Sequence, residues 1–155
     1  MDNCMLVTKP SLHLAGISHS GPYSSFPDDV IALRDEFLSR RHELSGNQKS
    51  TALICPYYGN EVFATYWVCY EVSMLELTPQ DMVQFTIPGH TYAMVSCTTQ
   101  RFGEGYKQLL EWMKEQGLSK LDEAVAIEIY HFDERLEEGL VEILIPVETG
   151  ASSRK

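Results

Sequence analysis

The stretch TALICPYYGNEVFATYWVCYEVSM, residues 51–74, decides the fold because it contains two apolar runs on either side of a Gly59-Asn60 turn. Residues 51–58 and 64–74 are rich in β-branched and aromatic side chains, which favour strands. Glycine and asparagine are typical of the turn between two such strands. We therefore predict a pair of strands here, and a second pair of the same kind at residues 124–132 and 139–147.

A strand and a helix precede each of these pairs. Residues 12–18 alternate as a strand, and the Gly-Pro turn within residues 19–23 is expected to stop it. A helix then opens at residues 27–29, because proline fits a first helical turn and carboxylates suit its positive end. In the second half, a strand at residues 91–98 leads to a helix that begins after Gly103 and ends at Gly117. The order β-α-β-β is therefore expected twice.

Nearly constant offsets relate the two halves. Tyr92 lies 79 positions after His13, Ala126 lies 74 after Ala52, and Val141 lies 73 after Val68. Such self-similarity predicts an internal duplication within a single domain, residues 1–155, with pseudo-repeats at about 12–74 and 91–147. A half of this size buries little surface alone, so we expect the halves to pair. The predicted fold is α+β, with a largely antiparallel sheet, two helices on one face and a central cleft.

Composition excludes several classes of function. The formal net charge of −10 and the isoelectric point near 4.8 argue against nucleic-acid binding, which needs clustered lysine and arginine. No apolar run is long enough to span a membrane, and the start of the chain lacks signal-peptide features. The four cysteines form no C-x-x-C pair, so we expect reduced thiols in a cytoplasmic protein, with no metal site and no cofactor.

Glu128 departs from the apolar pattern of its strand, Ala124–Tyr130. A carboxylate in a dry core costs several kcal/mol unless it is solvated, partnered or protonated. The offset of 74 residues makes Ile54 its counterpart in the first half. Two interpretations remain open: Glu128 faces solvent from an exposed position, or it is a cleft carboxylate that awaits a cationic or hydrogen-bonding ligand.

Aromatic residues favour the second interpretation, because tyrosine and tryptophan offer flat contact area, a polar handle and attraction for cations. Any one of these rings is also a reasonable core residue. The predicted ligand-binding residues are Glu128, Tyr130, Trp112, Tyr23, Phe37, Trp67 and Tyr70.

Taken together, several motifs resemble the GyrI-like domain, the effector-binding domain of AraC-type and MerR-type bacterial regulators. The resemblance runs from about Leu12 to Val147. It rests on the segments His19–Tyr23, Ile87–Ala93, Leu110–Trp112, Ile127–Tyr130 and Ile143–Val147.

The resemblance implies a duplicated fold with a central cleft. It also implies a strand glutamate, matched by Glu128, that contacts ligands in multidrug-sensing members, and cleft rings best matched by Tyr130 and Trp112. The repeat begins by residue 12, so no helix-turn-helix segment is expected. Action on transcription would then need a separate regulator.

Three functions follow from these observations. The first is binding of an aromatic small molecule, in particular a lipophilic cation, around Glu128. The second is hydrolysis of reactive electrophiles with Glu128 as general base, although the sequence lacks a nucleophile elbow and a phosphate loop. The third is a gyrase-inhibitor-like interaction with a protein such as gyrase, for which the acidic pairs at 133–134 and 137–138 form the one local cluster.

Overall fold

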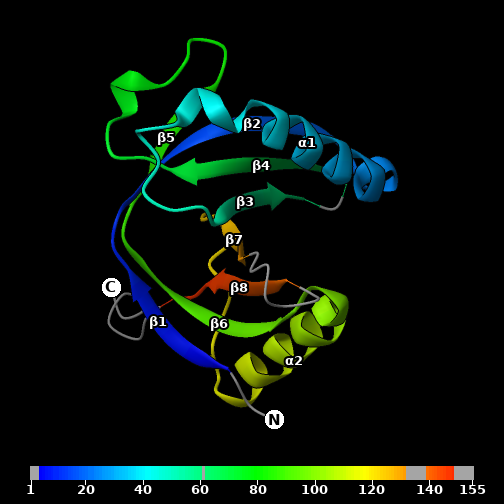
Figure 1. The fold of residues 1–155 in the computed structure, drawn as a ribbon. Coiled ribbons are helices and arrows are strands. Elements are labelled where there is room, and N and C mark those ends of the chain that lie inside the picture. Colours follow the sequence, from blue (N-terminus) through cyan, green and yellow to red (C-terminus); the bar gives the residue numbers. More distant parts are fainter. Residues whose placement is uncertain (1–3, 61, 132–138, 149–155) are drawn as a thin grey trace. The chain divides into compact units, whose positions relative to one another are not determined.

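The computed structural model describes residues 4–60, 62–131 and 139–148. The chain divides into two compact units. Unit 1 comprises Met1–Pro10 and Gly89–Lys155, and unit 2 comprises Ser11–Pro88. We describe each unit by itself, with the labels of Figure 1. The acidic pairs at 133–134 and 137–138 lie outside the described residues.

Unit 2 is a four-stranded antiparallel sheet in the order β3-β4-β2-β5, with helix α1 packed on β2 and β4 (Figure 1). Leu33 and Phe37 are the buried residues of α1 and lie one helical turn apart, which gives the helix its apolar stripe. The elements in chain order are β2 (Leu12–Pro22), η1 (Tyr23–Ser25), α1 (Phe26–Arg40), η2 (Arg41–Leu44), β3 (Leu53–Gly59), β4 (Phe63–Glu71), η3 (Leu75–Leu77) and β5 (Val83–Ile87).

Unit 1 has the matching arrangement, an antiparallel sheet in the order β1-β6-β8-β7 with helix α2 packed on β6 and β8. Gly105, Leu109 and Met113 form the buried stripe of α2. Gly117 follows with φ +70°, the left-handed conformation that commonly ends a helix. The elements are β1 (Met5–Lys9), β6 (His90–Thr98), η4 (Thr99–Arg101), α2 (Phe102–Glu115), β7 (Ala126–His131) and β8 (Leu140–Pro146).

These observations confirm the α+β class, the antiparallel strands and the two β-α-β-β series. The single-domain assignment, the duplication and the central cleft stay predictions. Strand β2 is longer than expected: His19–Pro22 pair with residues 63–66 of β4 instead of turning away. Proline is accommodated because Pro22 is the last residue of the strand, where the ladder needs no N–H.

The sequence pattern missed β1 and β5, and each of them pairs across the order of the chain. Strand β1 is joined to β2 through Pro10 and Ser11 but pairs with β6 in unit 1. Strand β5 is joined to β6 through Pro88 and Gly89 but pairs with β2 in unit 2. Each unit therefore contains one strand whose chain neighbour belongs to the other unit.

The ladders correct the offsets between the halves. Leu12 and His90 begin β2 and β6 and lie 78 positions apart, whereas Leu53 and Ala126 begin β3 and β7 and lie 73 apart. The ends of β4 and β8, Glu71 and Pro146, lie 75 apart. The pairing agrees, because these offsets carry the Ile54–Cys69 pair onto the observed Ile127–Leu144 pair.

The corrected counterpart of Glu128 is therefore Cys55, and the sequence-based assignment to Ile54 was wrong by one residue. In a strand, a slip of one residue moves a side chain to the opposite face. Ile54 lies on the face of the unit 2 sheet away from Cys55, so the two assignments describe different surroundings.

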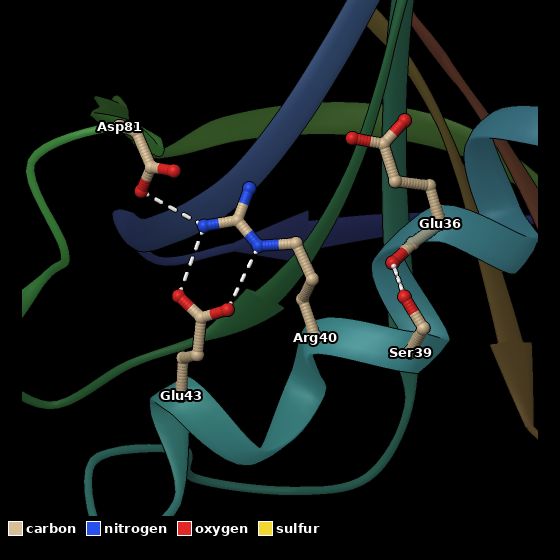
Figure 2. Close-up of polar contacts among 5 residues, drawn as sticks. All are labelled: Glu36, Ser39, Arg40, Glu43 and Asp81. Carbon is tan, nitrogen blue, oxygen red and sulfur yellow. Dashed lines mark hydrogen bonds and ion pairs between the residues drawn. The ribbon is translucent and has the colours of Figure 1, made fainter.

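Arg40 fixes the end of α1 to the segment that leads into β5. Its Nε and Nη2 donate to the two carboxylate oxygens of Glu43 at 2.8 and 2.9 Å, and Nη2 also reaches Asp81 at 2.8 Å (Figure 2). These hydrogen bonds raise the pKa of Arg40, and the Arg40 guanidinium lowers the pKa of Glu43. One planar guanidinium thus links residues 43 and 81 on either side of the β3–β4 hairpin.

Candidate functional site

Glu128 lies at the centre of β7 and is only 8% exposed. Tyr130 is as deeply buried, and its hydroxyl donates a 2.8 Å hydrogen bond to Oε1 of Glu128. The contact follows from strand geometry, since residues two apart project from the same face. Glu128 is thus a buried carboxylate, and the interpretation that it faces solvent from an exposed position does not fit the structure.

The register of the sheet places this pair on the face that α2 covers. Glu128 is opposite Ile143 and Tyr130 is opposite Val141, so these four side chains share one face. Val141 in turn is opposite Cys97 of β6, and a methyl group at Gly105 of α2 would meet the Cys97 sulfur. The helix, the carboxylate and the phenol therefore lie on the same side of the unit 1 sheet.

The chemistry of the pair suits a buried negative charge. A phenol that donates to a carboxylate stabilises its ionised form and fixes the direction of its second oxygen. Burial in turn strengthens the attraction of that charge for any cation that displaces water from it. The arrangement can hold a positive or hydrogen-bond-donating group, and it can orient a water molecule.

Trp112 is the third predicted residue of unit 1. It lies on α2 beside the buried stripe, next to Met113, and is partly exposed. Its helix covers the face that carries Glu128, so Trp112 shares that side of the sheet with the carboxylate.

The four predicted residues of unit 2 do not form one group. Phe37 and Tyr70 are 0% and 2% exposed and pack edge to face at 5.1 Å, so they belong to the core under α1. Trp67 lies on the opposite face of the sheet from Tyr70 and packs on Phe85. Expecting all of them to line a cleft overlooked that strand neighbours at odd spacing face opposite ways.

Tyr23 is the most accessible of the four, at 47% exposed, in the turn η1. Its hydroxyl lies against Gly59 of β3, and a Cβ at Gly59 would come within 2.6 Å of that oxygen. A glycine at this point leaves room for the tyrosine to lie over the end of the hairpin.

Sequence reasoning missed a polar cluster where β2 meets α1. Asp29 Oδ2 accepts a 2.6 Å hydrogen bond from Ser25 and lies 3.0 Å from Nε2 of His19. The hydrogen bond from Ser25, followed by the charge of His19, lowers the pKa of Asp29 against a smaller effect of burial. The available signal was the spacing of Ser25 and Asp29, four residues apart on one side of a helix.

Two structural searches gave negative results over the described part of the chain. Among residues 4–60, 62–131 and 139–148, no helix is long and apolar enough to cross a membrane. Over the same residues, histidine, cysteine and carboxylate side chains do not gather in a group of three or more that would hold a metal ion.

Comparison with known families gives one match over nearly the whole chain. Residues 2–148 match the model of the GyrI-like small-molecule-binding domain. No curated protein sequence matches this chain.

Solved structures share the fold at low sequence identity. The structure of SAV2435 bound to tetraphenylphosphonium is 13% identical, with a TM-score of 0.77 over 99% of this chain and 97% of that one. The C-terminal domain of EcmrR is 18% identical, with a TM-score of 0.69 over 94% and 97%. A hydrolase from Listeria innocua is 11% identical, with a TM-score of 0.58 over 94% and 92%. At these identities the likeness establishes the fold.

Proposed function

The chain belongs to the family of GyrI-like small-molecule-binding domains, and on this basis we propose that it binds lipophilic aromatic cations with Glu128 as the counter-charge. Binding would sequester or sense the compound. Because the net charge is −10, the protein's field also attracts cations over longer distances.

The observation that supports this function is the buried carboxylate of Glu128, held by Tyr130 on the helix-bearing side of unit 1. A large aromatic cation has a weakly hydrated charge, so it loses little when it enters an apolar site that contains a carboxylate. The SAV2435 structure holds tetraphenylphosphonium, a compound of this kind, in a protein with this fold.

The proposed contact residues are Glu128 for charge, Tyr130 for orientation of the carboxylate, and Trp112 and Tyr23 for ring contacts. Aromatic faces attract cations and supply flat contact area. Phe37, Trp67 and Tyr70 are left out of this set, because the first and third fill the core and the second faces away from α1.

The test is calorimetric titration of the protein with tetraphenylphosphonium. Glu128→Gln should weaken binding by at least about tenfold, which corresponds to 1.4 kcal/mol. Glu142→Gln is the matched control, because Glu142 lies on the neighbouring strand β8, pairs with Ile129 and faces the other side of the sheet. It removes the same charge from the protein and should leave the affinity within twofold.

Equal losses in the two variants would show that only the overall field matters and would overturn the role of Glu128. Absence of binding by the parent protein to tetraphenylphosphonium, and to a planar cationic dye used alongside it, would count against the function itself.

A second candidate is hydrolysis of a reactive electrophile. It is favoured by the Glu128–Tyr130 hydrogen bond, which resembles an acid–base pair, and by the fold shared with the Listeria innocua hydrolase. Incubation with activated esters and strained-ring compounds, followed by mass spectrometry, distinguishes the two. Turnover that is lost in both Glu128→Gln and Tyr130→Phe would establish an enzyme, and no turnover above the Glu128→Gln background would leave binding as the function.

We also propose that the protein acts in the cytoplasm and that any effect on transcription passes through a separate regulator. Gyrase as the partner is the alternative. Purification of a tagged copy with and without tetraphenylphosphonium, and identification of the proteins retained, tests both.

A further inference from the structure

The His19–Asp29–Ser25 cluster in unit 2 is not used by the proposed function. The side chains of His19 and Asp29 are 40% and 30% exposed, so the ion pair is sheltered but reachable. Ser25, the residue before α1, gives its hydroxyl to Asp29 rather than capping the helix. The hydroxyl and the imidazole thus both converge on one carboxylate oxygen, Oδ2.

The hydrogen bond to Asp29 determines which ring nitrogen of His19 is available. A carboxylate can only accept, so Nε2 of His19 carries the shared proton. In the neutral ring Nδ1 is then an acceptor, and it makes no hydrogen bond with the described residues. The other oxygen of Asp29 is likewise outside the printed contacts of the cluster. Together they offer two acceptors for a hydrogen-bond donor.

Flat side chains border this pair. His19 is opposite Tyr66 on β4, which is opposite Tyr57 on β3, so three rings form one row on the α1 side of the sheet. Tyr57 and Tyr66 stack with ring centroids 6.3 Å apart, and Phe26 lies 5.9 Å from the imidazole. Such surfaces suit an aromatic compound.

Gly21 leaves space beside the imidazole. A methyl group at Gly21 would lie 3.3 Å from Nε2 of His19, and no other described atom beyond its chain neighbours would come within 4 Å. Gly21 is nevertheless buried and has no left-handed backbone that would require glycine. The position therefore tolerates a side chain conformationally while keeping a sheltered opening next to His19.

We propose that unit 2 carries a second small-molecule site, in which the His19–Asp29 pair accepts a hydrogen bond from the N–H or O–H group of a small planar aromatic compound lying beside Gly21. This site is separate in its residues from Glu128 and does not depend on the proposed function. Its ligands are neutral aromatic donors rather than lipophilic cations.

The probes are indole and 1-methylindole, which differ in the N–H donor. The carbon-bound imidazole signals of His19 are followed by two-dimensional ¹H–¹³C NMR and assigned with His19→Gln. Indole should shift the His19 signals saturably. 1-Methylindole should bind about fivefold more weakly, as expected for the loss of one hydrogen bond. The signals of His13, whose Nδ1 bonds to Thr86 at 2.8 Å, serve as the internal control and should not move.

Gly21→Val fills the opening without removing a polar group and should weaken indole binding at least tenfold. Ser20→Val is the matched control, because Ser20 is the adjacent residue on the opposite face, where it bonds to Thr65. It should change the affinity less than twofold. Asp29→Asn provides a second test if Gly21→Val does not fold, and it should weaken indole at least threefold. Glu128→Gln should leave indole binding unchanged.

The proposal is overturned by an absence of saturable shifts at His19, by equal affinity for the two indoles, or by equal affinity in Gly21→Val and Ser20→Val. Loss of indole binding in Glu128→Gln would assign the probe to the unit 1 site instead. Because tetraphenylphosphonium is measured on the same variants, failure here leaves the result for Glu128 readable on its own.

Discussion

The two units place different chemistry at equivalent positions. Helices α1 and α2 begin 76 residues apart, at Phe26 and Phe102, so Asp29 of unit 2 corresponds to Gly105 of unit 1. His19 corresponds to Cys97 by the offset of β2 and β6. In unit 2 these positions make an ion pair, whereas in unit 1 they pack so closely that only glycine fits.

The reverse holds on the neighbouring strand. Glu128 and Tyr130 of β7 correspond to Cys55 and Tyr57 of β3, so unit 1 keeps a charge where unit 2 has a buried thiol. Each unit thus departs from an apolar core at one point, and at a different point. The shared positions carry the fold, and the differing positions carry the candidate sites.

The largest effect is expected at Gly16 of β2, whose counterpart in unit 1 is Met94. A Cβ at Gly16 would lie 2.0 Å from the Val68 carbonyl oxygen, so the backbones of β2 and β4 would have to separate. Gly16→Ala should lower the free energy of unfolding by about 3 kcal/mol. Met94→Leu, with no such constraint, should cost under about 1.5 kcal/mol. Urea denaturation measures both, and similar losses would contradict the assignment.

A smaller effect is expected where α2 meets β6. Gly105→Ala places a methyl group 2.6 Å from the Cys97 sulfur and should cost about 2 kcal/mol, partly restored by Cys97→Ala in the double variant. Gly103→Ala on the same helix meets no described atom within 4 Å and should be neutral or slightly stabilising. A double variant no more stable than Gly105→Ala would place the strain elsewhere.

Removal of the Tyr130 hydroxyl tests the polar position of unit 1. Tyr130→Phe leaves the buried Glu128 without one donor and should cost about 1 kcal/mol in thermal or urea unfolding. The control is Tyr58→Phe, because Tyr58 is exposed on β3, and its change should stay within about 0.5 kcal/mol. A neutral Tyr130→Phe would mean that Glu128 needs no help from the phenol.

The smallest effect concerns acid stability and Asp29. Its pKa is lowered from 3.8 by the hydrogen bond from Ser25 and by His19, so the unfolded chain binds a proton before the folded one does. The stabilisation is present above pH 3.8 and is lost as the pH falls through the lower folded value. The pH dependence of unfolding below pH 4 should therefore be shallower in Asp29→Asn than in the parent. Parallel curves would contradict it.

Local patterns were sufficient to predict both helices and six of the strands, because periodicity and turn residues determine them within short windows. They did not predict β1 or β5, whose partners lie about 80 residues away in the chain. No local signal reports a ladder of that separation.

The candidate site was predicted where chemistry is unusual for its strand, and not where packing decides. Glu128 was identified because a carboxylate in an apolar strand is costly. Phe37 and Tyr70 were misjudged because an aromatic side chain looks alike in a core and in a cleft. The His19–Asp29 pair was missed because it joins a strand to a helix through a contact that spacing alone does not give.

The exchange of β1 and β5 has a consequence for synthesis on the ribosome. Unit 2, Ser11–Pro88, is continuous, so all of its strands are available once residue 88 has left the exit tunnel. Unit 1 needs β1, made first, and β8, which ends at Pro146. At ordinary elongation rates β1 waits on the order of ten seconds for its sheet to be completed. The first strand to emerge is therefore among the last to be buried, and a chaperone that protects Met5–Lys9 during that interval would help this chain more than one that acts on its middle.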